Sequence, residues 1–144
     1  RITDRKKEMF KTSGGKYIAP QLIENRMKQS FFMEQVMVIG DGEKMPAAFI
    51  QPNFGFVREW AHRHGFEITG TNEELIANPK VIERFQQEVD HANEKFGNRK
   101  KVKRFELTPD VWSIEAGHLT PTLKLRRKIV KEKYQHLYDK IYNS

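Results

Sequence analysis

The chain has 144 residues and a mass of 17.0 kDa, the size of one domain with its own hydrophobic core. Its hydrophobic fraction is 38%, its mean hydropathy is −0.75, and no apolar run approaches the ~20 residues of a membrane span, so a soluble globular domain is predicted. The absence of cysteine excludes a disulfide scaffold, a thiol nucleophile and a cysteine-based zinc site, and it fits a cytoplasmic location. The sequence begins at Arg1 without an initiator methionine or an apolar signal core, so we expect a piece of a longer protein.

The net charge of +7 is concentrated in one part of the chain. Residues 1–94 carry 13 Lys and Arg against 14 Asp and Glu, whereas residues 95–133 carry 12 against 4. Such a surface attracts polyanions, whether nucleic acid, acidic lipid or a phosphorylated small molecule. A solvated basic face without any ligand explains the same pattern, so charge alone leaves both interpretations open.

The first third of the chain predicts two hairpins and a helix. Residues 7–18 favour two short strands around a Ser-Gly-Gly loop, and Pro20 suits the first turn of a helix. The expected stripe of that helix consists of Leu22, Ile23, Arg26 and Met27. Residues 35–51 predict a strand–turn–strand hairpin, because a Gly-Asp-Gly-Glu turn separates two β-rich runs.

Two more helices are predicted in the middle of the chain. Asn53 can cap a helix that carries Phe54, Val57, Trp60 and Ala61. The Gly- and Thr-rich segment 65–72 ends it, and Asn78-Pro79 is a typical start for the next helix. Apolar residues spaced three and four apart are then expected to be buried: Ile82, Phe85, Val89, Ala92 and Phe96.

The last third predicts a strand, an irregular segment and a helix. Residues 101–107 alternate as a strand does, and residues 108–125 contain two prolines, a glycine and little periodicity. A final helix begins at about Arg126, with one apolar face formed by Val130, Tyr134, Leu137, Tyr138 and Ile141. Hairpins and helices without a repeating βαβ pattern predict an α+β fold, with a small antiparallel or mixed sheet, flanking helices and a short N-terminal β-hairpin.

The patterns of several common catalytic sites are absent from the sequence. His62 and His64 are two residues apart, which on a helix directs them to different faces, and no partner at metal-ligand spacing is expected for His91, His118 or His136. No GxSxG elbow is present, so neither a metal site nor a serine hydrolase is expected. Residues 12–16 share residue types with a phosphate loop but lack the GxxxxGK[ST] spacing. The basic and aromatic residues of segment 99–105 would suit a nucleic-acid groove, yet no recognition helix, RNP-like motif or zinc finger accompanies them.

Lys124 is the candidate residue for anion recognition. It lies in the irregular segment between apolar neighbours, where a lysine can be delivered as a point charge to a phosphate or carboxylate. Composition alone favours the simpler interpretation, an ordinary surface lysine ahead of a basic helix.

Two segments of the sequence resemble the motifs of one enzyme family. Asp4–Glu8, Lys11–Pro20 and Ile23-Glu24 are similar to the hinge segment of AMP-forming acyl-CoA synthetases, which belong to the adenylate-forming superfamily. Leu119–Arg127, with its Thr-Pro-Thr-Leu-Lys core, is similar to the C-terminal catalytic-lysine motif in its long-chain fatty acid version. The two motifs stand in the family's order about one small domain apart, and the resemblance spans essentially the whole chain. It implies the mobile C-terminal domain of a long-chain fatty acid–CoA ligase.

The resemblance implies a two-step reaction and a division of the chain. A fatty acid carboxylate attacks ATP to give acyl-AMP and pyrophosphate, and CoA then displaces AMP to give the thioester. Residues 1–7 would be the hinge from an N-terminal domain that this sequence lacks, and residues 8–144 the C-terminal catalytic domain. ATP and CoA would be substrates, and Mg²⁺ would accompany ATP, held mainly by the N-terminal domain. The partners expected are that domain, fatty acid, ATP and CoA, and not nucleic acid; the isolated domain is expected to be inactive.

The same resemblance assigns roles to individual residues. Lys124 would meet the carboxylate and the α-phosphate during adenylation, where a fixed positive charge offsets the developing negative charge. Rotation at the hinge would then withdraw it and bring a glycine loop to the site, whose bare backbone leaves room for the pantetheine arm. The other roles are these: ribose and phosphate contacts for Arg5, Lys11 and Lys16, the hinge for Lys7, and CoA binding for Ser13, Gly14 and Gly15.

Several alternatives stay open at the level of sequence. Leu123 stands where many family members have glycine before the catalytic lysine, which leaves the register of the motif open. The basic run 99–104 is a candidate for the CoA phosphates, or a solvated face. The whole chain could also be a free-standing basic module for nucleic acid or anionic lipid, or part of a ligase for a shorter or aromatic acid. No transmembrane segment is predicted, and a peripheral membrane contact stays open.

Overall fold

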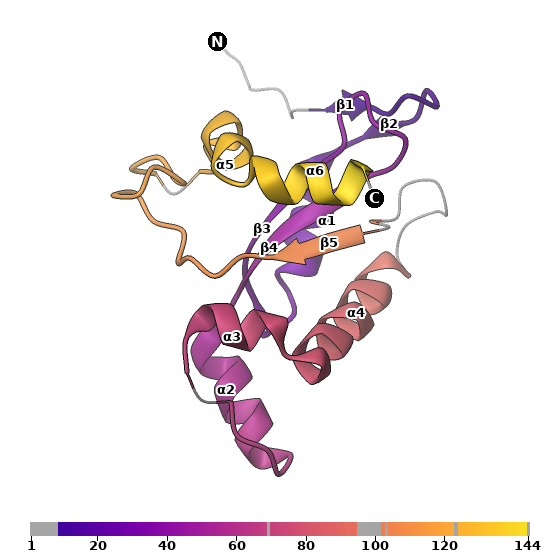
Figure 1. The fold of residues 1–144 in the computed structure, drawn as a ribbon. Helices are drawn as coiled ribbons and strands as arrows, with labels where there is room; N and C mark the ends of the chain where they lie inside the picture. The colour runs from indigo at the N-terminus through magenta and orange to yellow at the C-terminus, as the bar shows by residue number, and fades with distance from the viewer. Residues whose placement is uncertain (1–8, 69, 95–101, 103, 123, 144) are drawn as a thin grey trace.

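The computed structural model describes residues 9–68, 70–94, 102, 104–122 and 124–143. Arg5 and Lys7 lie outside the described residues, as do Leu123 and most of the basic run 99–104. In chain order (Figure 1) the elements are β1 (Phe10–Lys11), β2 (Tyr17–Ile18), α1 (Pro20–Met27), β3 (Met33–Ile39), β4 (Ala47–Pro52), α2 (Phe54–Arg63), α3 (Asn72–Ala77), α4 (Pro79–Asn93), β5 (Arg104–Leu107), α5 (Arg127–Lys133) and α6 (Gln135–Asn143).

Two sheets organise these elements. β1 and β2 form a small antiparallel hairpin at the N-terminal end. The central sheet has the order β3-β4-β5, in which β3 pairs antiparallel and β5 pairs parallel with β4. The expected α+β fold, a small mixed sheet with flanking helices after a short hairpin, is therefore confirmed.

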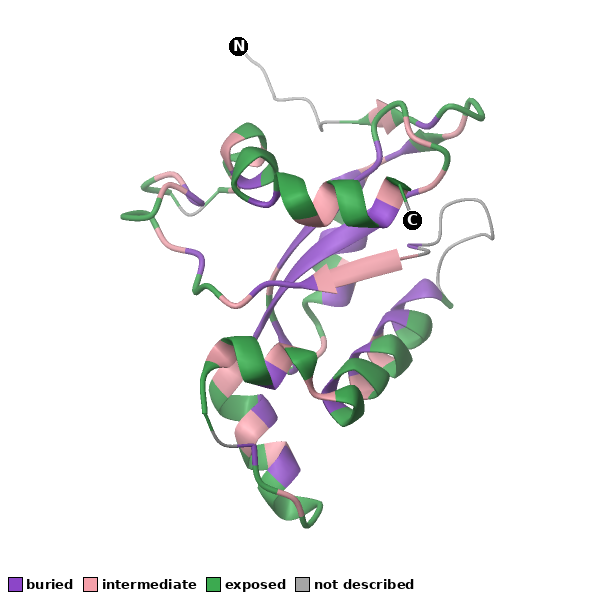
Figure 2. Cartoon of the chain, in the orientation of Figure 1, coloured by how far each residue is buried: buried purple, intermediate pink, exposed green. Residues whose placement is uncertain are grey.

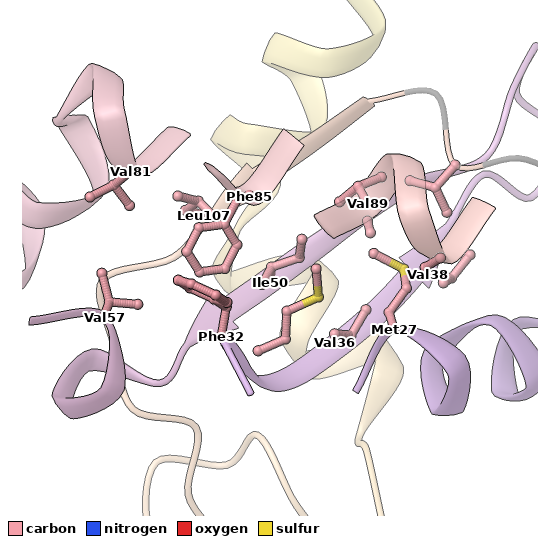
Figure 3. Packing of buried hydrophobic residues seen from close by; sticks show 14 of the residues in the cluster. Met27, Phe32, Val36, Val38, Ile50, Val57, Val81, Phe85, Val89 and Leu107 are labelled. Atoms are coloured by element: carbon pink, nitrogen blue, oxygen red, sulfur yellow. The ribbon is translucent and has the colours of Figure 1, made fainter. Parts of the chain in front are cut away.

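The central sheet is covered on both faces, which divides the core in two. Side chains alternate along a strand, so Val36 and Val38 of β3 enter one core while Met37 and Ile39 enter the other. Helices α1 to α4 cover the first core, whose packing Figure 3 shows, and α5 and α6 cover the second. The middle strand β4 is buried along its whole length, as the continuous purple in Figure 2 shows, because it has helices on both sides.

Some residues predicted to be buried are exposed instead. Ile82 is 43% exposed, and its neighbour Val81 is fully buried in its place, followed by Phe85, Val89 and Ala92 as expected. Val81 lies four residues before Phe85 and Ile82 lies three before it. Both separations fit a helical period, so the pattern alone could not show which of the two side chains is buried. In α1, Ile23 and Met27 are buried, but Leu22 is 52% exposed. Phe96 lies outside the described residues.

Two element boundaries also differ from the prediction. The final helix is divided: α5 ends at Lys133, the next residue, Tyr134, has a non-helical backbone (φ −112°, ψ 30°), and α6 begins at Gln135. Helix α3 was not predicted, although the sequence contains its signal. Thr71 and Glu74 form a capping box, in which each side chain accepts a hydrogen bond from the other residue's backbone N–H.

Candidate functional site

Lys124 lies on a short loop that closes on itself. Leu119 and Leu125 form an antiparallel bridge, and the segment that they flank is here called the lysine loop, whose described residues are 120–122 and 124. The N–H of Thr120 donates to the Lys124 carbonyl over 2.8 Å, and the N–H of Lys124 donates to the Thr120 hydroxyl over 3.1 Å. Lys124 itself is exposed. The loop therefore presents the lysine side chain to solvent from a hydrogen-bonded backbone.

The base of the lysine loop rests on a buried histidine. His118 is 2% exposed, and its carbonyl accepts a hydrogen bond from the N–H of Arg126 over 2.8 Å, which closes the loop. Its Nδ1 accepts from the N–H of Ser113 over 3.2 Å, so the proton of the neutral ring lies on Nε2. Nε2 then donates to the Tyr134 hydroxyl over 3.1 Å, and that hydroxyl donates to Asp110 over 3.0 Å.

The segment before the loop is attached to the central sheet. The indole N–H of Trp112 donates to the Thr108 hydroxyl over 3.0 Å, and the backbone N–H of Trp112 donates to the Gln51 side chain over 3.1 Å. The Trp112 ring stacks on the His118 ring, with centroids 5.7 Å apart and an interplanar angle of 4°. A chain of side chains thus connects β4 to the loop that carries the lysine.

Burial sets the protonation of this network. Desolvation, assisted by the charge of Lys133, lowers the pKa of His118, which favours the neutral ring that the hydrogen bonds require. Desolvation and the nearby Asp110 carboxylate raise the pKa of Tyr134, so its hydroxyl stays protonated and can donate. Gly117, just before His118, has φ +92°, a conformation that favours glycine and allows the chain to turn into the loop.

The predicted CoA-binding loop is built differently. It connects β1 to β2 and is here called the glycine loop, residues 12–16. It is held mainly by backbone bonds: the N–H of Ser13 donates to the Glu43 carbonyl over 2.8 Å, and the N–H of Gly15 to the Thr12 carbonyl over 2.9 Å. A side chain added at Gly14 or Gly15 would meet nothing within 4 Å, and Gly15 has φ +90°. The loop therefore projects into open space with a bare backbone.

The two loops are connected by a buried ion pair between their following helices. Glu24 of α1 accepts two hydrogen bonds from the Arg127 guanidinium at the start of α5, over 2.6 and 2.8 Å, and a third from the N–H of Val38 over 2.8 Å. The Glu24 side chain is only 6% exposed. Burial raises the pKa of Glu24, while Arg127 and the Val38 N–H act in the opposite direction. The two resembling motifs, 103 residues apart at this pair, thus meet through one carboxylate.

The remaining predicted cations have separate surroundings. Lys11 is exposed, with its ammonium 5.5 Å from the centre of the Tyr17 ring, and Lys16 is half-buried on the same hairpin. Arg104, the described arginine of the basic run 99–104, donates to the Ile141 carbonyl over 3.0 Å and so ties β5 to α6. A pocket of about 480 Å³ lies between the hairpin, the end of β3 and helices α5 and α6, with Lys128, Lys131 and Tyr138 in its wall.

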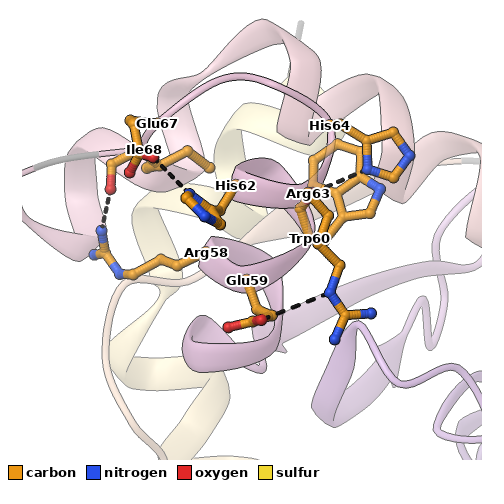
Figure 4. Close-up of polar contacts among 8 residues, drawn as sticks. All are labelled: Arg58, Glu59, Trp60, His62, Arg63, His64, Glu67 and Ile68. Carbon is orange, nitrogen blue, oxygen red and sulfur yellow. Dashed lines mark hydrogen bonds and ion pairs between the residues drawn. The ribbon is translucent and has the colours of Figure 1, made fainter.

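The other histidines support no metal centre. His62 hydrogen-bonds to Glu67 over 2.7 Å, whereas His64 contacts the Trp60 carbonyl over 2.9 Å, and Figure 4 shows the two rings directed apart. His91 does have a carboxylate partner, Glu94 at 3.7 Å, contrary to the prediction, but both side chains are about 70% exposed. Among the described residues, no three His, Cys, Asp or Glu side chains gather as metal ligands would.

The structure also bears on membrane association. In the part of the chain that the structure describes, no helix combines the length and the apolar character needed to cross a bilayer.

Sequence comparison finds long-chain fatty acid–CoA ligases among the relatives. The chain is 30% identical over 142 residues to the long-chain-fatty-acid–CoA ligase FadD15 of Mycobacterium tuberculosis, covering 99% of this chain and 24% of that protein. It is 33% identical over 147 residues to human long-chain-fatty-acid–CoA ligase 1, covering 100% of this chain and 21% of that protein. The chain therefore spans between a fifth and a quarter of the length of these curated relatives.

Structural comparison gives the same fold. The adenylation domain of a carboxylate reductase from Mycobacterium chelonae superposes with a TM-score of 0.76 at 17% identity, over 94% of this chain and 19% of that one. A didomain of the carboxylic acid reductase from Segniliparus rugosus, determined in complex with AMP, gives a TM-score of 0.73 at 20% identity, over 98% of this chain and 18% of that one. The family model of the AMP-binding enzyme C-terminal domain matches residues 8–144, and the chain belongs to that family.

Proposed function

We propose that this chain is the C-terminal domain of an AMP-forming long-chain fatty acid–CoA ligase in the cytoplasm. Lys124 would serve adenylation of the fatty acid, and the glycine loop would serve transfer of the acyl group to CoA. Family membership and the long-chain ligases among the relatives support this proposal over a free-standing basic binding module. ATP with Mg²⁺, fatty acid and CoA would be the substrates, bound together with an N-terminal domain.

The placement of Lys124 is the observation that most directly supports this proposal. Its ammonium is exposed while its backbone is fixed by hydrogen bonds within the loop and by the buried base at His118. A lysine held in this way can enter a site on another domain as a point charge. In the first step it would offset negative charge on the carboxylate and the α-phosphate without reorganising, which is how fixed charges lower barriers.

The separation of the two loops supports an exchange between two orientations. Figure 1 shows the connection that carries Lys124 and the β1–β2 hairpin on opposite sides of α5 and α6. If both loops act at one site on another domain, a change in the orientation of this domain would exchange them. Rotation about Lys7 would present them in turn, with Arg5 on the ribose and Lys11 and Lys16 near phosphates. These four roles are carried over from the resemblance.

The test compares the two half-reactions in the full-length ligase. Lys124→Ala is expected to lower fatty-acid-dependent ATP–pyrophosphate exchange by about 100- to 1,000-fold, the usual loss for one charge-stabilising group. Thioester formation from supplied acyl-AMP and CoA should stay within about threefold of wild type, because Lys124 has left the site by then. Lys128→Ala, four residues further along on α5, is the matched control and should leave exchange near wild type.

Either of two results would contradict the proposal. Equal loss in both half-reactions would remove the adenylation role of Lys124. Absence of exchange with every carboxylic acid in a folded wild-type enzyme would remove the reaction class. A series of acids of decreasing chain length, including aromatic acids, identifies the preferred substrate in the same assay.

A further inference from the structure

The lysine loop has few attachments beyond its base. Within the described residues, the hydrogen bonds of Thr120, Thr122 and Lys124 stay inside the loop itself. Leu119, where the loop begins, is buried, with 4% of its surface exposed. The direction in which the loop projects is therefore set where it meets the domain, at His118 and Arg126.

His118 fixes that base from several sides. Its backbone N–H donates to the Ser113 carbonyl over 3.0 Å and its carbonyl accepts from Arg126. Its two ring nitrogens contact Ser113 and Tyr134, and its ring packs against the rings of Trp112 and Tyr134, with centroids 5.7 and 6.0 Å away. Because both nitrogens have hydrogen-bond partners and the ring packs against two others, the ring has one orientation and one tautomer.

Tyr134 extends this arrangement to the helices that cover the second core. It lies where α5 ends and α6 begins, is 3% exposed, and donates its hydroxyl proton to Asp110. Its ring also packs against Phe49 of β4, with centroids 5.7 Å apart. Through Tyr134, the base of the lysine loop is therefore in contact with both the helix junction and the central sheet.

We propose that His118 is a positioning residue for the adenylation lysine, acting with Tyr134 and Asp110 to hold the lysine loop at the angle that adenylation requires. The inference rests on the proposed function of Lys124. The ring of His118 is covered, so it acts through the backbone that carries Lys124 and not on the substrates. A displacement of about 1 Å in a reacting group can cost about 100-fold in rate. A small shift of the backbone at His118 would move Lys124 and lower the rate of adenylation even if the loop stays folded.

The test uses the full-length ligase and the two half-reactions. His118→Phe keeps a ring packed against Trp112 and Tyr134 but removes both nitrogen contacts. It is expected to lower the kcat of adenylation by about 10- to 100-fold, with the KM for ATP within about threefold of wild type. Thioester formation from supplied acyl-AMP should be unchanged, because that step does not use the lysine loop. Tyr134→Phe, which removes only one hydroxyl, should give the same selective pattern at smaller size.

A double-mutant cycle distinguishes positioning from stability. In a Lys124→Ala background, His118→Phe should cause no further loss of adenylation, because the group that it positions is gone. Val89→Ala, a cavity variant in the first core on the other face of the sheet, is the control for general destabilisation and should affect both half-reactions alike. His136→Phe, at an exposed histidine, should affect neither.

Three results would overturn the inference. Equal loss of both half-reactions in His118→Phe and in Tyr134→Phe would reduce these residues to a structural role. An additive further loss in the Lys124→Ala background would mean that His118 does not act through the lysine. Normal exchange in Lys124→Ala alone would overturn the proposed function as well, and the single variant distinguishes that failure from the other two.

Discussion

The lysine loop and the glycine loop are held in opposite ways. The lysine loop rests on buried side chains, with the rings of Trp112, His118 and Tyr134 stacked beneath it and joined by hydrogen bonds. The glycine loop is attached through backbone groups to the turn between β3 and β4, and open space surrounds Gly14 and Gly15.

The difference in support fits the role proposed for each loop. A point charge acts through its position, so the element that carries it gains from a rigid support on both sides of its base. A loop that admits a long flexible substrate arm gains from the absence of side chains and from a backbone that leaves space. The ion pair between Glu24 and Arg127 lies between the two regions and fixes the helix after one loop against the helix after the other.

The largest expected effect is a loss of stability when the ion pair between the two regions is broken. Arg127→Ala leaves the Glu24 carboxylate buried without its cation, and we expect the free energy of unfolding to fall by about 3–5 kcal/mol. Urea unfolding of this chain measures the change. Lys140→Ala removes the cation of a more exposed pair with Glu106 and should cost less than about 1 kcal/mol.

The same position allows a stricter comparison. Glu24→Leu combined with Arg127→Met replaces the buried pair by apolar groups, and it should recover most of the stability lost in Arg127→Ala. If the double variant is as unstable as Arg127→Ala, or if Arg127→Ala costs less than about 1 kcal/mol, the pair does not hold the two regions together as described.

A smaller effect concerns the glycine loop alone. Gly14→Val adds a side chain where the structure has open space and where no left-handed backbone is required, so the stability of the chain should be unchanged. If the bare backbone admits the pantetheine arm, thioester formation from supplied acyl-AMP should fall by about 10-fold while ATP–pyrophosphate exchange stays at wild type. This pattern is the reverse of that expected for Lys124→Ala. Unchanged thioester formation in Gly14→Val would contradict the CoA role of the loop.

The smallest effect is a pH dependence from the support of the lysine loop. The pKa of His118 in the folded chain lies below its ordinary value of 6.5. Below pH 6.5 the histidine is therefore protonated more in the unfolded chain than in the folded chain. The free energy of unfolding should therefore fall as the pH drops through about 6.5 toward 5, by less than about 1.4 kcal/mol per pH unit.

The difference between wild type and His118→Phe isolates this contribution, which should vanish in the variant. His62 is a useful contrast, because its hydrogen bond to Glu67 raises its pKa. Its contribution has the opposite sign: it is present at low pH and is lost as the pH rises through its folded pKa. Urea unfolding from pH 8 to pH 5 measures both, and a wild-type curve parallel to that of His118→Phe would contradict the prediction.

Part of the fold and of the site could be predicted from local signals. Two β-rich runs on either side of a Gly-Asp-Gly-Glu turn identified the hairpin of β3 and β4, and Asn78-Pro79 identified the start of α4. The roles of Lys124 and of the glycine loop were predicted from the resemblance of two motifs to those of acyl-CoA synthetases, and they stay predictions. The choice between Val81 and Ile82 was wrong because both satisfy the helical period, and only the packing of α4 on the sheet distinguishes them.

The sequence by itself determined the order of the motifs and which residues were proposed for the chemistry, because motifs, turns and periodicity are local properties of the chain. Only the tertiary structure decided what supports them. His118 has the same local appearance as any loop histidine, and its contacts with Tyr134, and through it with Asp110, depend on chain segments 16 and 24 residues apart being packed together. Glu24 and Arg127 are further apart still, and burial makes each of them necessary to the other. Such pairings are decided by the free energy of the whole core, which no local pattern encodes.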